Sequence, residues 1–177
     1  MKVTSYHTTT DIPPIFNQTS SERVATIISR YPTGKEKSAL IPILHLAQDE
    51  FGGWLSPSTM DYVASLLNLK PIEVYEVASF YSMFNLRPVG KYVLEVCHTG
   101  PCSLNGSDDI IQFLKNKLNI NAGETTPDGM FTLKTVECLA SCGTAPMMQI
   151  GKHYHEKLTP ASITQLLDDL RAKHPNA

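Results

Sequence analysis

The stretches CHTGPCSLNG at residues 97–106 and ECLASCG at residues 137–143 hold all four cysteines of the chain. The first stretch spaces Cys97 and Cys102 as C-x4-C, and the second spaces Cys138 and Cys142 as C-x3-C. Both stretches are rich in glycine and small residues, which let a backbone approach a bound group closely and aim its N–H groups at it. The pattern indicates one site built from two pairs of thiols.

Each cysteine pair follows a predicted β-strand. The segment YVLEV at 92–96 leads directly to Cys97, and MFTLKTV at 130–136 leads to Cys138. Both segments are rich in residues that favour strands. We expect the two strands to be neighbours in one sheet, because their ends then bring the four sulfur atoms together at one edge. That arrangement would be a metal-binding geometry.

The region around the cysteines predicts a small α/β domain of order β-α-β-β-α. A helix is expected after Cys102 with Ser103 or Asn105 as its N-cap, so that the positive end of the helix lies beside the thiols. A short strand is expected at PMMQI (146–150), and the YH segment after the Gly151–Lys152 turn is a candidate continuation of it. Thr159–Pro160 is expected to open a last helix.

The first half of the chain predicts four short helices. Their starts are marked by capping residues or by proline in the first turn. The expected first positions are Thr19, Ser38, Ser56 and Pro71. Three parts of the chain follow from this pattern: a flexible N-terminus at 1–18, a helical subdomain at 19–86 and an α/β domain at 87–177.

The composition excludes several classes of protein. A charged share of 18% and a net charge of -2 do not give the strongly basic surface of a nucleic-acid-binding protein. No apolar run is long enough to span a bilayer, and the N-terminus lacks the apolar core of a secretion signal. We therefore expect no direct membrane insertion and a cytoplasmic location. In that reducing compartment, four cysteines indicate a metal or redox site and not a disulfide framework.

A 2Fe-2S cluster suits the two pairs best, because it takes four cysteine thiolates, two on each iron. Three alternatives stay open from the residues alone. A structural zinc site also uses four thiolates, although its pairs are usually C-x2-C or close to it. A thiol-disulfide oxidoreductase normally carries C-x-x-C. Four inert cysteines are the third alternative.

No other pattern in the sequence points to a catalytic site. His98 is the only histidine beside the cysteines, and we expect it to face solvent or to tune a bound group without binding it. His45 is expected to pack within a helix through a hydrogen bond, and His153 and His155 to lie on the surface. The sequence contains no G-x-G-x-x-G, P-loop or nucleophile-elbow motif. As part of an oxidoreductase, the chain is therefore expected to carry electrons for another subunit.

Together these segments resemble the thioredoxin-like 2Fe-2S subunit of respiratory complex I, the NADH:quinone oxidoreductase. The resemblance rests on both cysteine stretches, on IPILHLAQDEFGGWL at 41–55, on VYEVASFYSMF at 74–84 and on the longer run GETTPDGMFTLKTVECLASCGTAPMMQI at 123–150. It covers nearly all of the chain beyond the N-terminal segment and includes every cysteine.

The resemblance implies an α/β fold in which an N-terminal helical subdomain precedes a thioredoxin-like 2Fe-2S ferredoxin domain. It implies that the ligands of one 2Fe-2S cluster are Cys97, Cys102, Cys138 and Cys142. FMN and NADH would bind only to a flavin-containing partner subunit, with which this chain exchanges electrons. The family also supplies the corresponding subunit of NAD-linked hydrogenases and formate dehydrogenases, so these stay alternatives. A zinc-stabilised interaction module is the non-redox alternative.

The resemblance also implies where the chain works. Its helices would pack on the flavoprotein, and the chain would reach the inner face of the cell membrane only through the other subunits of the complex. Large aromatic residues are the usual anchors of such interfaces. The candidates here are Trp54, Phe80, Tyr81 and Phe84.

Overall fold

The computed structural model describes residues 14–174 and divides the chain into two compact units, Met1–Pro88 and Val89–Ala177. Of the N-terminal segment expected to be flexible, residues 1–13 lie outside the described range. The first described helix begins at Gln18. The two units are described separately below.

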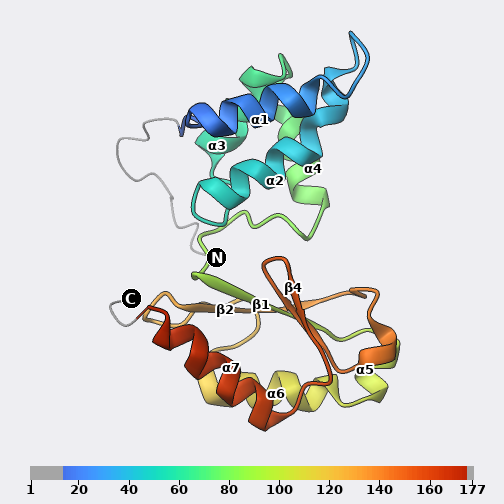
Figure 1. Ribbon diagram of the computed structural model, residues 1–177, viewed down its shortest axis with the longest axis vertical. Coiled ribbons are helices and arrows are strands. Elements are labelled where there is room, and N and C mark those ends of the chain that lie inside the picture. Colours follow the sequence, from blue (N-terminus) through green and yellow to red (C-terminus); the bar gives the residue numbers. More distant parts are fainter. Residues whose placement is uncertain (1–13, 175–177) are drawn as a thin grey trace, which may run out of the picture. The chain divides into compact units, whose positions relative to one another are not determined.

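The first unit consists of helices around one hydrophobic core (Figure 1). Their bounds are α1 (Gln18–Ile28), the short 3-10 helix η1 (Glu36–Ala39), α2 (Leu40–Glu50), α3 (Pro57–Leu66) and α4 (Pro71–Phe80). Side chains from α2, α3 and α4 meet in the core, where Ile43, Leu44, Val63 and Val74 are fully buried. The prediction of a helical first half is confirmed.

Two of the four predicted helix starts are confirmed. The Ser56 hydroxyl caps α3 by accepting from the amide three residues on at 3.1 Å, and Pro71 is the first residue of α4. Thr19 is wrong as a cap, because Asn17 takes that place and accepts from the amide three residues on at 2.9 Å. Ser38 is also wrong, because it lies inside η1, which leads directly into α2.

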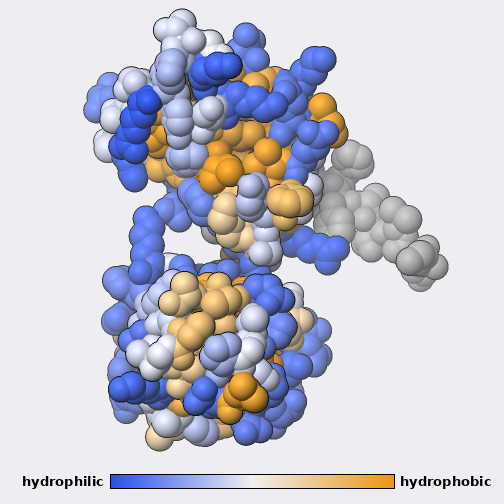
Figure 2. All heavy atoms as spheres, turned by 90° about the vertical axis from the view of Figure 1, so that its right-hand side faces the viewer, coloured by the Kyte–Doolittle hydropathy of each residue, from blue (hydrophilic) through white to orange (hydrophobic). Residues whose placement is uncertain are grey.

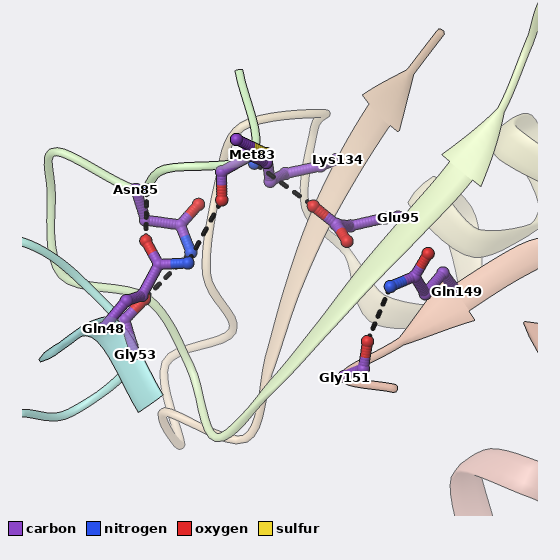
Figure 3. A network of polar contacts seen from close by, with 8 residues as sticks. All are labelled: Gln48, Gly53, Met83, Asn85, Glu95, Lys134, Gln149 and Gly151. Carbon is purple, nitrogen blue, oxygen red and sulfur yellow. Dashed lines mark hydrogen bonds and ion pairs between the residues drawn. The ribbon is translucent and has the colours of Figure 1, made fainter. Parts of the chain in front are cut away.

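A side-chain amide network holds the segment that follows α4 against the end of α2 (Figure 3). Gln48 Nε2 donates to the carbonyl of Met83 at 3.1 Å, and Gln48 Oε1 accepts from the Asn85 amide at 2.7 Å. Asn85 Nδ2 donates to the carbonyl of Gly53 at 2.9 Å. Both ends of the Gln48 amide are thus bonded, which fixes the course of the chain beyond α4.

The second unit contains a four-stranded sheet of order β2-β1-β3-β4. Its strands are β1 (Tyr92–Cys97), β2 (Phe131–Val136), β3 (Met148–Ile150) and β4 (His153–His155). Strands β1 and β2 run parallel, β3 is antiparallel to β1, and β4 is antiparallel to β3. The predicted pairing of the first two strands is confirmed. The predicted order β-α-β-β-α holds except that an additional strand, β4, follows β3 before the last helix.

The two faces of this sheet differ. Helices α6 (Ser107–Leu118) and α7 (Pro160–Ala172) cover one face (Figure 1), where Leu94, Leu133, Leu114 and Leu167 are fully buried in one core. Side chains alternate along each strand, so the other face carries polar residues such as Glu95, which accepts from Lys134 Nζ at 3.4 Å (Figure 3). The Thr159 cap predicted for α7 is confirmed, because its hydroxyl accepts from the Ser162 amide at 3.1 Å.

Candidate metal centre

The ends of β1 and β2 place the two cysteine stretches at the same edge of the sheet. Cys97 is the last residue of β1 and pairs with Val136 at the end of β2. The next amide, that of His98, donates to the Val136 carbonyl at 3.1 Å, and the Cys97 amide donates to the Met147 carbonyl at 3.2 Å. Because parallel strands end at the same edge, Cys138 follows β2 on the side where Cys97 follows β1. This was the geometry expected from the sequence.

The first pair of thiols is buried. Cys97 is 2% exposed and Cys102 is 1% exposed, and both pack with the fully buried Met147. Leu139 from the second cysteine stretch and Ala145 pack against the same group. The two stretches therefore share one small apolar cluster at the sheet edge.

Cys102 lies within a short helix and not, as predicted, just before a helix. Helix α5 (Gly100–Leu104) carries it, and α6 begins separately after Gly106, whose φ of 91° lies in the left-handed region. Neither Ser103 nor Asn105 caps α6 through its side chain. The Asn105 amide group instead donates to the Pro101 carbonyl at 2.6 Å and closes α5. The signal for the break was Gly106, which favours this backbone conformation.

The second pair of thiols is exposed and lies in a loop that ends in the short 3-10 helix η2 (Cys142–Thr144). The sulfur atoms of Cys138 and Cys142 are 3.8 Å apart. Two thiolates on one tetrahedral metal with metal–sulfur bonds of ~2.3 Å lie about 3.8 Å apart, so this pair has the spacing of ligands that share one metal ion. The amide of Ala140, which has φ 61°, donates to the Cys138 sulfur at 3.4 Å.

The thiols influence one another's ionisation. Burial raises the pKa of Cys102 to about 11, together with the hydrogen bond and the charge of Cys97 and the charge of Cys142. The hydrogen bond and the charge of Cys138 raise the pKa of Cys142. For Cys97, burial acts to raise the pKa, but amide donors at Thr99 and Leu139 and the hydrogen bond from Cys102 together lower it. The four groups thus form one electrostatic site, and a bound cation would relieve the repulsion between their thiolates.

The cysteines stand as two pairs. Within residues 14–174, no three side chains of His, Cys, Asp or Glu are grouped so that they could hold a single metal ion. Two pairs of sulfur atoms, one buried and one exposed, at a shared sheet edge fit a centre that has two metal ions with two thiolates on each.

In the described part of the chain, no histidine joins the cysteines in a group of three side chains that could hold a metal ion. His98 is exposed, and its Nε2 lies 3.9 Å from Glu137 Oε1, so it faces a carboxylate at the surface. His45 packs with its ring centroid 5.0 Å from that of Phe84, and the residue is exposed. His153 is exposed as predicted, whereas His155 is partly buried, which lowers its pKa together with the charge of His153.

Two residues outside any recognisable motif contact the exposed loop. Tyr154 donates from its hydroxyl to the Leu139 carbonyl at 2.7 Å. Glu156 accepts hydrogen bonds from Ser141 and Thr144, on either side of Cys142. Both lie on or just after β4, and sequence reasoning missed both. Only the pairing of β4 at the edge of the sheet reveals their position.

The second unit is thus a small α/β domain in which two pairs of cysteines meet at one edge of the sheet. A profile of the family described as thioredoxin-like [2Fe-2S] ferredoxin matches residues 24–171. The chain belongs to this family, and its cofactor is one 2Fe-2S cluster.

Curated relatives carry names from respiratory enzymes. The chain is 46% identical over 160 residues to an NADH-quinone oxidoreductase subunit of Rickettsia typhi, and the match covers 90% of this chain and 94% of that protein. It is 48% identical over 160 residues to NADH dehydrogenase [ubiquinone] flavoprotein 2, mitochondrial, of Dictyostelium discoideum, covering 90% of this chain and 65% of that protein. The resemblance inferred from the sequence is therefore confirmed.

A solved structure supports the fold alone. A chain of an NAD+-reducing [NiFe]-hydrogenase in the air-oxidised state superposes with a TM-score of 0.66 at 22% identity, over 77% of this chain and 23% of that chain. The predicted fold class is confirmed, whereas the domain boundaries and the individual ligands stay predictions. Among the described residues, no helix has both the length and the apolar character needed to cross a bilayer.

Proposed function

We propose that the four cysteines bind the cluster in two pairs, Cys97 with Cys102 on one iron and Cys138 with Cys142 on the other. The observation that carries this assignment is the meeting of the two pairs at the shared edge of β1 and β2. The 3.8 Å separation between the sulfur atoms of Cys138 and Cys142 supports it, as does the hydrogen bond between the Cys97 and Cys102 thiols. When bound, a 2Fe-2S cluster accepts and returns one electron.

The protein groups around the thiols suit that chemistry. Backbone N–H groups at Thr99 and Leu139 favour the thiolate form of Cys97, and one at Met147 favours that of Cys102. The Ala140 amide serves Cys138 in the same way. Such donors stabilise added negative charge, while the burial of Cys97 and Cys102 excludes water on one side. Together they set how readily the site takes up an electron.

The chain then acts as the electron-transfer subunit of an NADH:quinone oxidoreductase. It exchanges electrons with the flavin of an NADH-oxidising partner subunit, which alone binds FMN and NADH. Relatives at 46% and 48% identity carry names of that enzyme, so this function is favoured over the equivalent subunit of an NAD-linked hydrogenase or formate dehydrogenase. Attachment to the inner face of the cell membrane would then come through the other subunits of the complex.

Exposed apolar residues supply a surface for the partner. In the first unit, Phe80 is 80% exposed, and Tyr81, Met83 and Leu86 are also exposed. Phe84, which was expected among these anchors, is instead buried in the core. Trp54 is half-buried. Figure 2 shows hydrophobic residues on both units within a largely hydrophilic surface, and in the second unit Leu104, two residues after Cys102, is 90% exposed.

The ligand assignment is tested by purifying the protein without oxygen after growth with ample iron. Two irons and two acid-labile sulfides per chain are expected for a 2Fe-2S centre, with an electron paramagnetic resonance signal after reduction. Serine in place of Cys97, Cys102, Cys138 or Cys142 should abolish or alter that signal, because an alkoxide is a harder donor than a thiolate. His98→Ala is the control and should leave the signal intact. Stoichiometric zinc without iron would refute the proposal.

A further inference from the structure

The two cysteine pairs are held in place by different means. Cys97 and Cys102 belong to β1 and α5 and are buried among apolar side chains. Cys138 and Cys142 lie in an exposed loop, and η2, which begins with Cys142, contains no buried residue. Leu139 and Ala145, the residue that follows η2, are the two described residues of this segment that pack against the apolar cluster. Hydrogen bonds therefore contribute much of what fixes the separation of the two sulfur atoms.

Glu156 supplies two of these hydrogen bonds. Its Oε1 accepts from the Ser141 hydroxyl at 2.5 Å and from the Thr144 hydroxyl at 2.7 Å. Ser141 directly precedes Cys142, and Thr144 is the last residue of η2, so one carboxylate oxygen spans the turn that carries this cysteine. The next backbone amide, that of Lys157, donates to the Thr144 carbonyl at 2.8 Å and reinforces the same connection.

Tyr154 supplies the corresponding contact beside Cys138. Its hydroxyl donates at 2.7 Å to the carbonyl of Leu139, the residue that directly follows Cys138. The Leu139 side chain packs against the buried cysteines, so this bond joins the exposed loop to the buried half of the site. Tyr154 pairs with Gln149 in the β3–β4 ladder, which holds its backbone in place.

We propose that Tyr154 and Glu156 are positioning residues that hold Cys138 and Cys142 at the separation needed to bind iron. This inference rests on the proposed function, because it assumes that the two cysteines are ligands. Glu156 acts in two ways. It accepts hydrogen bonds from the Ser141 and Thr144 hydroxyls, and its negative charge opposes the addition of an electron to a cluster nearby. Removing its charge should therefore make the reduction potential of the centre more positive, whereas removing its hydrogen bonds should loosen the loop.

The experiment compares cluster release from the purified, loaded protein and its variants in the presence of an iron chelator, followed by the loss of visible absorbance. Glu156→Ala should release the cluster about 10-fold faster, which is the usual scale for residues that orient metal ligands. Tyr154→Phe should release it about 3-fold faster, as expected for the loss of one hydrogen bond. Glu156→Gln keeps an accepting oxygen and should restore most of the slow release, with a more positive reduction potential.

Glu124→Ala is the matched control. Glu124 is also an exposed carboxylate of the second unit that accepts two hydrogen bonds, from the backbone and side-chain amides of Asn121 at 2.6 Å and 3.3 Å, in a loop without cysteines. This control should release the cluster at the wild-type rate. Release within two-fold of wild type for both Glu156→Ala and Tyr154→Phe would refute the positioning role while leaving the ligand assignment standing.

The outcomes separate the two proposals. A wild-type protein that carries no iron refutes the ligand assignment itself. If Glu156→Ala does not fold, as judged by circular dichroism, the decision rests on Tyr154→Phe, which removes a single oxygen atom. A normal release rate and a normal paramagnetic resonance spectrum for that variant would overturn the inference.

Discussion

Asp128 shows how one side chain joins the turn before β2 to the last helix. Its carboxylate accepts from the Thr126 hydroxyl and, at 3.0 Å, from the Met130 amide. It also lies 3.8 Å from a guanidinium nitrogen of Arg171 on α7, whose guanidinium carbon is 5.3 Å from the centre of the Phe131 ring. The hydrogen bond from Thr126 is the largest of several effects that lower the pKa of Asp128.

The lowered pKa predicts a pH-dependent stability. A carboxylate whose pKa is lower in the folded state stabilises the fold above its unfolded pKa, and that stabilisation is lost as the pH falls through the folded pKa. Because Asp128 is exposed and water screens its charge, Asp128→Asn should lower the free energy of unfolding at pH 7 by only about 0.5–1 kcal/mol. The difference from wild type should shrink in acid, at pH values below ~3.9. Urea unfolding at several pH values measures it.

A control for this measurement is available on the same helix that supplies Arg171. Asp168 is exposed on α7, and Asp168→Asn should change the free energy of unfolding by less than about 0.5 kcal/mol, as is usual for surface substitutions. An Asp128→Asn penalty that stayed constant down to strongly acidic pH would show that the carboxylate charge is not the cause.

At the level of helices and strands, position 90 has no room for a side chain, because the backbone that leads into β2 lies close to Gly90. It lies just before β1, and its amide donates to the Thr132 hydroxyl at 2.6 Å. A Cβ atom at this position would lie 3.0 Å from the Gly129 carbonyl oxygen and 3.0 Å from the carbonyl carbons of Met130 and Phe131. These are backbone atoms, so they cannot rotate away as a side chain could.

Gly90→Ala should therefore destabilise the entry into the sheet. We expect the free energy of unfolding to fall by about 1–3 kcal/mol, the usual cost of forcing extra atoms into a packed region, as measured by denaturant unfolding. Gly143→Ala in the apoprotein is the matched control, because a Cβ atom there meets nothing within 4 Å. Equal stability of the two variants would contradict this account.

Most elements were predictable from the sequence, but their ends were less so. Pro71 and the caps at Ser56 and Thr159 carry local signals that act within one turn, and the structure has them where expected. Thr19 and Ser38 failed because a capping residue close by, or a 3-10 turn that runs into the helix, satisfies the same amides equally well. A single sequence does not distinguish these solutions.

Some features of the cysteine site were likewise predictable from the sequence, and others were not. The strands that lead to Cys97 and Cys138 were predicted from their composition, and their parallel pairing brings the stretches together. The unequal burial of the two pairs was not predictable, because it depends on Met147 and Leu139 packing from other elements. The contacts of Tyr154 and Glu156 were missed for the same reason, since they depend on the place of β4 in the sheet.

At the scale of the whole molecule, each of the two units has a large hydrophobic core of its own among the described residues, and these two cores share no residue. One core draws its buried side chains from Phe16 to Phe84, and the core of the second unit draws them from Leu94 to Leu170. Each unit therefore has its own driving force for folding. All four cysteines belong to the second unit.

This division predicts that a fragment of residues 89–177 folds alone and binds the cluster. Its visible and paramagnetic resonance spectra should match those of the full chain, because the groups around the thiols are retained.

The helical unit is expected to be needed for binding to the partner. Coexpression of the full chain with the NADH-oxidising flavoprotein should give a stable complex in which NADH reduces the cluster. The fragment should bind the flavoprotein much more weakly. A fragment that bound the flavoprotein as tightly as the full chain would show that the helices are not the docking surface.

The unequal cover of the two thiol pairs also bears on how the protein is matured and damaged. In the folded chain, a donor that delivered a preformed cluster would meet Cys138 and Cys142 first, since Cys97 and Cys102 are almost completely buried. Ligand exchange during assembly would begin at the exposed pair and finish at the buried pair. Oxidants from the solvent would also reach the cluster on the side of Cys138 and Cys142. Assembly of the cluster and its oxidative loss would therefore both begin at the exposed pair.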